Sequence, residues 1–297
     1  MPPSRVDPVV EFAPAKLNLD LHVTSRRADG YHELDSLVVF ADLGDELTFV
    51  PADDISLEIA GPFADLLPVD ADNLVLRAAH ALAGAAAPPV GAHIRLDKRL
   101  PVAAGIGGGS ADAAATLRGL QRLWGTTLGP ADLARLGLGL GADVPVCLLG
   151  RSVRMRGIGE LLQPLAGSPM LDLVLVNPCR PLATAAVFKA SDPGAFAPRS
   201  VVVPAQPTLD WLCTGRNDLE PAARLLLPEI DRILAALAAE PGCGVARMSG
   251  SGPTCFGAFA DQATAAAAAD RLVRDHPGWW VKRCRSLAAP DHGFART

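Results

Sequence analysis

A glycine-rich stretch is the first feature of this chain that could do chemistry. Residues 105–110 read GIGGGS, and from Ser110 to Trp124 apolar residues recur at the spacing of an amphipathic helix. The first N–H groups of a helix lack backbone partners and lie at the positive end of the helix dipole, and glycines let a ligand approach them closely. The stretch therefore favours the binding of a phosphate group.

Neither of two familiar phosphate-binding motifs matches these residues. The P-loop ends in Gly-Lys-Ser or Gly-Lys-Thr, and this loop contains no lysine. The dinucleotide-binding pattern has a third glycine where Ser110 stands, after Gly105 and Gly107. A purely structural alternative is a turn whose glycines serve close packing, with Ser110 as the N-cap of the helix.

Strands and helices in irregular order must position this loop. Alternating apolar runs predict strands, and helical periodicity with flanking Gly and Pro predicts helices. We expect strands at 19–24, 36–43, 46–50, 55–60, 93–98, 171–177 and 280–286, and helices at 73–83, 110–124, 219–239 and 262–275, with another beginning at 129–130. The lack of regular βαβ alternation predicts an α+β fold. Length predicts two domains, 1–165 and 166–297, with a proline-rich connection near 193–207.

Composition narrows the classes of function. The chain has 49% hydrophobic and 20% charged residues, no apolar run long enough to cross a bilayer and no export signal, so we expect a soluble, cytoplasmic protein. A net charge of −5 argues against binding nucleic acid or membranes through bulk charge, so an anionic ligand must be met locally. The six cysteines lack the spacing of a zinc site or a disulfide framework and are expected to be buried thiols.

Three separated motifs resemble those of the GHMP small-molecule kinases. They are PVAAGIGGGSADAAA at 101–115, APAKLNLDLHV at 13–23 and MSGSGPTCFGAF at 248–259. The resemblance implies an N-terminal α+β domain like ribosomal protein S5 domain 2, a ferredoxin-like C-terminal domain, and a site in the cleft between them. It also implies a kinase that uses ATP and Mg²⁺ and has a small-molecule alcohol as acceptor.

Further segments resemble one branch of that family. They are RRADGYHELDS, DNLVLRAA, LGADVPVCL and GIGE. The acceptor of that branch is a methylerythritol linked to cytidine diphosphate, which is phosphorylated on its 2-hydroxyl. Two alternatives stay open: a GHMP kinase of the homoserine or mevalonate type, against which GYH at 30–32 argues, and a nucleotide-binding protein without catalytic activity.

The resemblance assigns the catalytic roles to two residues. Asp143 would take the proton from the acceptor alcohol as general base, and Lys16 would orient that carboxylate and shield charge on the transferred phosphoryl group. Mere binding needs no proton acceptor, so this pair argues against an inactive protein. Asn18 shares a strand face with Lys16 and is expected in the same site. Without the resemblance, Asp143 would be interpreted as a turn residue and Lys16 as a solvated charge.

The acceptor is expected to bind at a separate group of residues. By resemblance, Tyr31 stacks on the cytosine ring and His32 hydrogen-bonds its polar edge. Phe188, with Thr184 before it, is the candidate second wall of this slot. The structural alternatives are a tyrosine that packs beside a hairpin and a surface histidine.

The nucleotide is expected to bind at Asn73, Lys98, Pro101, Ala103, Ala104, Gly105, Ile106, Gly107, Gly108, Gly109 and Ser110. A helix N-cap is the structural alternative for Asn73, and an exposed strand-end charge is the alternative for Lys98. Ser110 is expected to meet a phosphate or the Mg²⁺ ion beside it, and no other side chain is assigned as a direct metal ligand. Asp112 is expected to complement the helix dipole, with a water-mediated Mg²⁺ contact as the alternative.

Two further expectations concern the loops. The second glycine loop, 249–252 with Thr254, is expected to border the acceptor and the phosphates. Ala103 and Ala104 stand where this kinase branch often has glycines, which predicts a stiffer phosphate loop.

Overall fold

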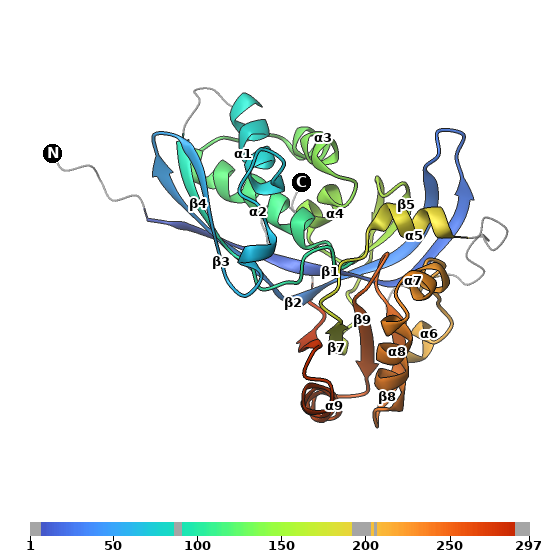
Figure 1. Ribbon diagram of the computed structural model, residues 1–297. Helices are drawn as coiled ribbons and strands as arrows, with labels where there is room; N and C mark the ends of the chain where they lie inside the picture. Colours follow the sequence, from blue (N-terminus) through green and yellow to red (C-terminus); the bar gives the residue numbers. More distant parts are fainter. Residues whose placement is uncertain (1–6, 86–90, 192–202, 205–206, 289–297) are drawn as a thin grey trace.

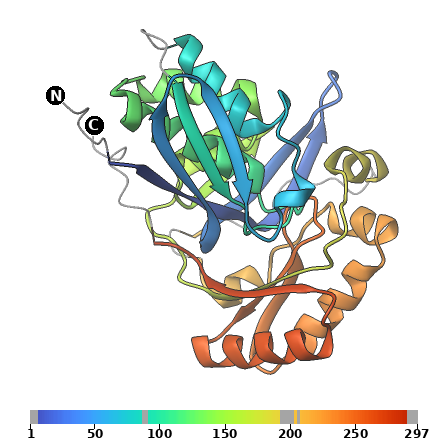
Figure 2. The ribbon, with the colours of Figure 1, turned by 60° about the vertical axis from the view of Figure 1, so that its left-hand side comes forward.

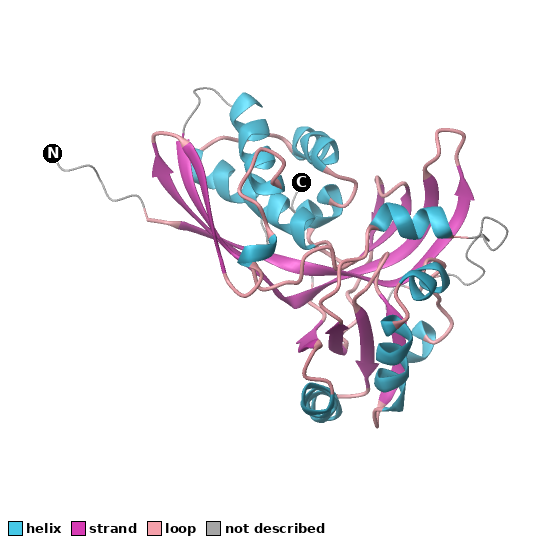
Figure 3. Ribbon diagram, viewed as in Figure 1, coloured by secondary structure: helices cyan, strands magenta, loops and turns pink. Residues whose placement is uncertain are grey.

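The computed structural model describes residues 7–85, 91–191, 203–204 and 207–288. Within them the strands are β1 (Val9–Arg26), β2 (His32–Ala52), β3 (Ile55–Ala60), β4 (Gly91–Asp97), β5 (Val153–Gly157), β6 (Leu161–Pro164), β7 (Asp172–Asn177), β8 (Cys243–Met248), β9 (Cys255–Phe259) and β10 (Trp280–Arg285). The helices are η1 (Ala64–Leu66), α1 (Leu74–Ala85), α2 (Gly108–Trp124), α3 (Pro130–Leu140), α4 (Val144–Leu149), α5 (Thr184–Ala190), α6 (Leu209–Leu212), α7 (Glu220–Leu226), α8 (Glu229–Ala239) and α9 (Gln262–Asp275). Figures 1 and 3 show how they are arranged. Most of the expected connection near 193–207 lies outside the described residues.

The first sheet is built around two long strands. Its order is β3-β4-β2-β5-β6, and β1 pairs along β2; β3 and β4 are parallel, and the other pairs are antiparallel. The β1–β2 register shifts between Pro14 and Lys16 and again between Asn18 and Asp20. Such irregularities re-aim side chains, and here they flank the two polar residues that the sequence places in the site.

The second sheet has the order β10-β7-β9-β8 and is antiparallel throughout. Helices α5 to α8 connect β7 to β8, and α9 connects β9 to β10, which gives the βαββαβ order of a ferredoxin-like unit. The first sheet ends at Pro164 and β7 begins at Asp172. The domain division after residue 165 itself stays a prediction.

The core has four layers, because β1 and β2 are apolar on both faces. Val38 and Phe40 pack under helices α1 to α4. Leu37 and Val39, which alternate with them, face Leu173 and other residues of the second sheet. Helices α7 to α9 cover the far face of that sheet. Figure 2 shows the two sheets between the helix layers, and the expected α+β architecture is confirmed.

Several element predictions need correction. Segments 36–43 and 46–50 belong to one strand, β2, and 19–24 is only part of β1. The helix expected at 110–124 begins two residues earlier, after Gly107 as N-cap. The single helix expected at 219–239 is α7 and α8, separated at Leu227 and Pro228, because proline disrupts a helix interior.

The described residues also show whether any helix could span a membrane and whether the cysteines are paired. None of their helices has both the length and the apolar character needed to cross a membrane. All six cysteines are unpaired, and Cys147, Cys255 and Cys284 are buried as expected. Cys179 and Cys213 are exposed, contrary to expectation, because they lie just beyond the ends of β7 and α6.

Candidate active site

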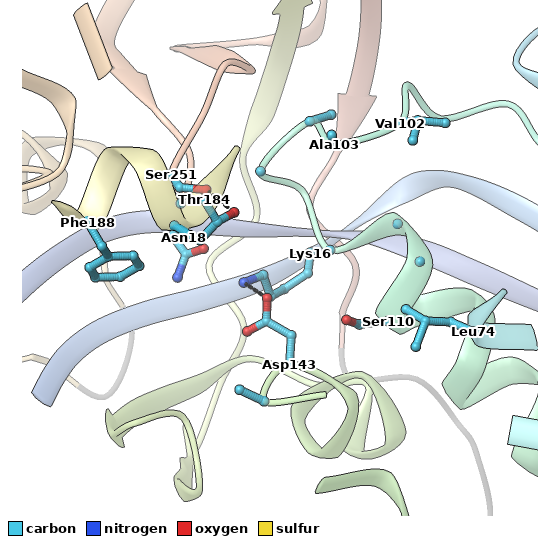
Figure 4. Close-up of a pocket in the computed structure, with 18 of the residues that line it drawn as sticks. Lys16, Asn18, Leu74, Val102, Ala103, Ser110, Asp143, Thr184, Phe188 and Ser251 are labelled. Atoms are coloured by element: carbon cyan, nitrogen blue, oxygen red, sulfur yellow. Dashed lines mark hydrogen bonds and ion pairs between the residues drawn. The ribbon is translucent and has the colours of Figure 1, made fainter. Parts of the chain in front are cut away.

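A cavity of about 1350 Å³ lies between the phosphate loop and the β1–β2 hairpin. Its lining comes from β1, residues 101–110, the segment before α4, helix α5 and the loop before β9. These segments are far apart in the chain, and only the fold brings them together. Figure 4 shows part of the lining, with Lys16 and Asp143 near its centre.

Lys16 and Asp143 meet although 127 residues separate them in the sequence. Lys16 Nζ lies 2.9 Å from Asp143 Oδ2. The lysine side chain is buried, whereas that of Asp143 is 36% exposed and lies at the start of α4. In Figure 4 the pair lies between Ser110 on one side and Phe188 on the other. The second carboxylate oxygen, Asp143 Oδ1, has no hydrogen-bond partner among the described residues and can accept a proton.

The phosphate loop lies directly against Lys16. The Lys16 N–H donates to the Ile106 carbonyl at 2.9 Å. Gly107 has φ 65° and is the N-cap of α2, with no side chain bonded to the free amides there. A Cβ on Gly107 would lie 3.0 Å from the Lys16 Cβ, and one on Gly105 would lie 2.6 Å from the Gly252 carbonyl oxygen. These two glycines therefore allow close packing as well as exposed amides.

The second glycine loop holds the first one in place. Ser249 Oγ donates to the Gly105 carbonyl at 3.2 Å, and the Thr254 N–H donates to the Ala104 carbonyl at 3.2 Å. Ser249 and Thr254 do not line the cavity, whereas Gly250 and Ser251 do. Part of this loop thus positions the phosphate loop rather than bordering the ligands.

Most of the predicted phosphate-loop residues line the cavity. Ala103 does so with φ 51°, a left-handed conformation that is unusual for a residue with a Cβ. Ile106 differs from its neighbours, because its side chain is buried in the core and only its backbone approaches the site. Ser110 lines the cavity as the third residue of α2, so it is not the N-cap.

Lys98 is buried, not an exposed strand-end charge. It is 2% exposed, and Nζ lies 2.6 Å from both Asp45 Oδ2 and Asp112 Oδ2. Burial alone would lower the pKa of Lys98, but the two carboxylates outweigh it and raise the pKa. Burial raises the pKa of Asp112 to about 7, against the attraction of Lys98. A Cβ on Gly108 would lie 3.2 Å from Nζ, so the buried charge supports the start of α2.

Asn73 and Asp112 each have a structural partner and also line the cavity. Asn73 Oδ1 accepts the Val75 N–H at 2.9 Å and caps α1, although the residue also lines the cavity. Asp112 pairs with Lys98, while its second oxygen, Oδ1, is buried without a partner in the described structure. Asp112 also contributes to the lining of the cavity.

The other end of the cavity is aromatic. The His32 and Phe188 rings stack with centroids 5.0 Å apart, and Tyr31 stands beside them, 59% exposed. Burial and, next, the charge of Arg26 lower the pKa of His32. Thr184 Oγ1 lies 2.8 Å from Ser251 Oγ at the start of α5.

Asn18 lies between this aromatic end and Lys16. Its Nδ2 donates to Ser36 Oγ at 2.7 Å. Its Oδ1 is buried and has no partner within the described residues. Asn18 lines the cavity, as expected from its place on the same strand face as Lys16.

Sequence reasoning missed part of the lining. An apolar wall near the phosphate loop consists of Leu67, Pro68, Leu74, Leu96 and Val102. Two cations, Arg26 and Lys189, line the aromatic end. The apolar wall comes from four separate segments, so no periodicity in the sequence could reveal it. Arg26 opens the segment RRADGYHELDS, and its place in that motif was the available signal.

Comparisons with known proteins show the family of the chain. The model of the GHMP kinase N-terminal domain matches residues 73–151, and that of the GHMP kinase C-terminal domain matches residues 209–277. A protein of Paramagnetospirillum magneticum named 4-diphosphocytidyl-2-C-methyl-D-erythritol kinase is 52% identical over 93% of this chain and 98% of its own length. The chain belongs to the GHMP kinase family.

Other relatives of this GHMP kinase carry similar names. A Cereibacter sphaeroides protein named 4-diphosphocytidyl-2-C-methyl-D-erythritol kinase is 56% identical over 93% of this chain and 98% of its own length. A solved structure described as 4-(cytidine 5'-diphospho)-2C-methyl-D-erythritol kinase has a TM-score of 0.79 and 37% identity, and covers 94% of this chain and 99% of its own. Homoserine kinase of Cytophaga hutchinsonii, at 20% identity, covers 96% of each chain with a TM-score of 0.70 and shares the fold.

The cavity of this GHMP kinase has a hydroxyl that could help to hold a cation, that of Ser110. No group of three or more His, Cys, Asp or Glu side chains that could hold a metal occurs within the described residues. Mg²⁺ in kinases is held mostly by phosphates and water, with one or two protein oxygens. Ser110 lines the cavity, and the unpartnered Asp112 Oδ1 is an orphaned buried acceptor two residues further along α2. The Ser110 hydroxyl, which faces the cavity, suits such an ion.

Proposed function

We propose that the protein transfers the γ-phosphoryl group of ATP to the 2-hydroxyl of 4-diphosphocytidyl-2-C-methyl-D-erythritol, giving the 2-phosphate and ADP. The observation that carries this proposal is the 2.9 Å Lys16–Asp143 pair, placed between a glycine loop and an aromatic recess in one cavity. Phosphoryl transfer between two large substrates requires a catalytic group that lies between the two places where they bind. The names of the relatives support the choice of acceptor.

In this mechanism Asp143 is the general base. Its Oδ1 takes the proton of the acceptor hydroxyl as the hydroxyl oxygen attacks the γ-phosphorus, and the bond to ADP breaks. Lys16 holds the other carboxylate oxygen at 2.9 Å, which fixes the direction of Oδ1. The same ammonium lies beside the start of α2 and offsets the negative charge of the phosphoryl group.

The phosphate loop holds the nucleotide in this proposal. Amides at the start of α2, together with the helix dipole, bind the phosphates, and Ser110 adds its hydroxyl. The apolar wall beside the loop (Leu67, Pro68, Leu74, Leu96 and Val102) receives the adenine ring. Asn73 and Lys98 contribute chiefly by positioning other parts of the site. Asn73 caps α1, and Lys98 Nζ lies next to Gly108 at the start of α2.

The aromatic end receives the acceptor. Tyr31 and Phe188 supply ring faces for the cytosine base, and a base stacked on an aromatic ring contributes roughly 1–3 kcal/mol. His32 meets the polar edge of the base. Asn18 Oδ1, buried without a partner in the described structure, accepts a hydrogen bond from an acceptor hydroxyl near Lys16.

Mg²⁺ is the proposed metal, with Ser110 as the residue that would hold it beside the phosphates. When bound, it would neutralise charge on the phosphate oxygens. Removing divalent cations with a chelator is expected to abolish ADP formation, and added Mg²⁺ is expected to restore it. A cytoplasmic location also stays a prediction from the sequence.

A substrate panel tests the function. The purified protein is given ATP and, separately, the cytidine-diphosphate-linked methylerythritol, homoserine, mevalonate and galactose, and ADP formation is followed. We expect the highest kcat/KM with the cytidine-linked acceptor. Faster turnover of homoserine or mevalonate would replace the proposal by another kinase of the family. No ADP with any acceptor would favour the inactive nucleotide-binding alternative, against which the Lys16–Asp143 pair now argues.

A further inference from the structure

Arg118 of α2 is a buried arginine that the proposed mechanism does not use. Its side chain is 6% exposed and does not line the cavity. A charged side chain is rarely buried unless it is paired and hydrogen-bonded. On β1, Glu11 Oε2 accepts from Arg118 Nε at 2.9 Å and the Phe12 carbonyl accepts from Nη2 at 3.2 Å. On α4, the Cys147 carbonyl accepts from Nη1 at 3.2 Å. The guanidinium therefore joins α2 to β1 and to α4.

These two elements carry the proposed catalytic pair. Lys16 follows Phe12 on β1, and Asp143 is the N-cap of α4. The Cys147 N–H donates to the Asp143 carbonyl at 3.2 Å, so Arg118 is two hydrogen bonds away from Asp143. Burial raises the pKa of Cys147 to about 12, and the charges of Asp143, Lys16 and Arg118 are the next causes that act on this thiol. Arg118 and the pair thus lie around the same buried residue.

Helix α4 needs support from outside itself to hold Asp143 in place. It runs only from Val144 to Leu149, and isolated helices of so few residues are marginal in water. Val144 and Val146 pack in the apolar cluster under α1 to α4, but apolar packing is not directional. The last four carbonyls of a helix have no partner within it, and Arg118 supplies one for Cys147. This hydrogen bond fixes α4 in a way that the apolar contacts do not.

We propose that Arg118 is a positioning residue for phosphoryl transfer. By holding the Cys147 carbonyl close to β1, it keeps Asp143 Oδ2 on Lys16 and Oδ1 directed at the acceptor hydroxyl. A displacement of about 1 Å at such a group can lower the rate by about 10²-fold. Arg118 touches neither substrate in this arrangement, so its loss should lower kcat and leave KM nearly unchanged. The inference rests on the proposed function, in which Asp143 is the general base.

Arg122 provides the matched control. It lies one turn further along α2, its side chain is 56% exposed, and its Nη2 lies 2.6 Å from Glu11 Oε1 and 2.7 Å from the Val10 carbonyl oxygen. It forms no hydrogen bond with α4 in the part of the chain that the structure describes. Because Arg122 remains, Arg118→Met does not leave the Glu11 carboxylate without a cation. Arg118→Lys is a second variant, since lysine keeps the charge but lacks the planar fork that reaches β1 and α4 together.

A double-mutant cycle separates positioning from general stability. The kcat for the cytidine-diphosphate-linked methylerythritol is measured in the wild type, Arg118→Met, Arg118→Lys, Arg122→Met, Asp143→Asn, and Arg118→Met combined with Asp143→Asn. Each value is expressed per nucleotide-binding site, counted by calorimetric titration with ATP. We expect Arg118→Met to lower kcat by roughly 10- to 100-fold with little change in the KM of either substrate, and Arg118→Lys to lower it as well. Arg122→Met should follow the wild type.

The decisive comparison is the effect of Arg118→Met in the Asp143→Asn background. If Arg118 acts through Asp143, the second change should have no further effect, because residues that act as one unit are not additive. A purely structural role would lower kcat by the same factor in both backgrounds. That equal loss, or an unchanged kcat in both Arg118 variants, would overturn the inference.

A second measurement does not depend on turnover. Crystal structures of the wild type, Arg118→Met and Arg118→Lys give the distance from Lys16 Nζ to Asp143 Oδ2, which is 2.9 Å with Arg118 present. We expect α4 to be displaced and this distance to be longer in the variants, whereas an unmoved pair would overturn the inference. If the wild type phosphorylates no acceptor, the proposed function fails, and the crystal structures still decide whether Arg118 positions Asp143.

Discussion

Replacement of Lys98 by methionine is expected to destabilise the fold strongly. Methionine has a similar length but no charge, so Lys98→Met leaves two buried carboxylates without their shared cation. Asp45 keeps hydrogen bonds from the Arg99 and Leu100 amides at 2.6 and 2.8 Å. Asp112 Oδ2 loses the only ion pair of that carboxylate, and its Oδ1 already has no partner in the described structure. The loss of folding stability in Lys98→Met therefore comes mainly from the Asp112 carboxylate.

The expected magnitude follows from this burial. Breaking a buried ion pair by removing one partner costs about 3–5 kcal/mol, because the remaining charge stays out of water. With roughly 2–4 °C of Tm per kcal/mol for a chain of this size class, the variant should melt about 6–20 °C lower. Urea unfolding followed by circular dichroism gives the free energy, and a thermal melt gives Tm.

Arg99 provides the matched control. It is the next residue and pairs with Asp97 at 2.6 Å, but its side chain is 45% exposed. An exposed pair contributes at most about 1 kcal/mol, so Arg99→Met should change little. Adding Asp112→Leu to Lys98→Met removes the stranded carboxylate and should recover part of the loss. Equal, small losses in Lys98→Met and Arg99→Met would refute the reasoning that the buried bridge stabilises this fold.

Four other predictions concern single residues. Asp143→Asn should lower kcat by roughly 10²- to 10⁴-fold with little change in nucleotide affinity; a rate near that of the wild type would remove Asp143 from the mechanism. Tyr31→Ala should raise the KM of the cytidine-linked acceptor more than that of ATP, and equal effects would argue against stacking. Ala103→Gly should leave the free energy of unfolding unchanged or raise it by up to about 1 kcal/mol in urea titrations, because glycine relieves the φ of 51° but is freer when unfolded. A thiol reagent analysed by mass spectrometry should label the exposed Cys179 in the native protein but not Cys147, whose pKa burial raises to about 12; rapid labelling of Cys147 would contradict its burial.

The sequence predicted the family and the α+β class because these depend on local patterns. The glycine loop and the segments around Lys16 and Asp143 are short, ordered motifs that can be recognised without knowing the fold. The positions of most core strands also followed from local apolar runs. Their lengths did not, because β1 and β2 are buried on both faces and lose the alternation that marks a strand end.

The sequence does not reveal the state of several side chains, because tertiary partners decide it. An exposed charge remained an alternative for Lys98, because its partners are distant in the sequence: Asp45 is 53 residues away and Asp112 is 14 residues away. Thr254 reads as a ligand contact until its N–H is found on the Ala104 carbonyl. Arg26 reads as one of two equivalent arginines until the strand register places it opposite His32.

Strand β1 has a consequence for how this protein could be divided. Its residues Leu21 and Val23 pack into the apolar cluster under α7 to α9, while Ala13, earlier in the same strand, belongs to the cluster under α1 to α4. A fragment beginning after residue 165 would therefore expose a bare patch where those two side chains belong. Strand β1 thus contributes to the cores of both parts of the protein. A chimera that takes either part from a relative would have to take β1 from that relative as well.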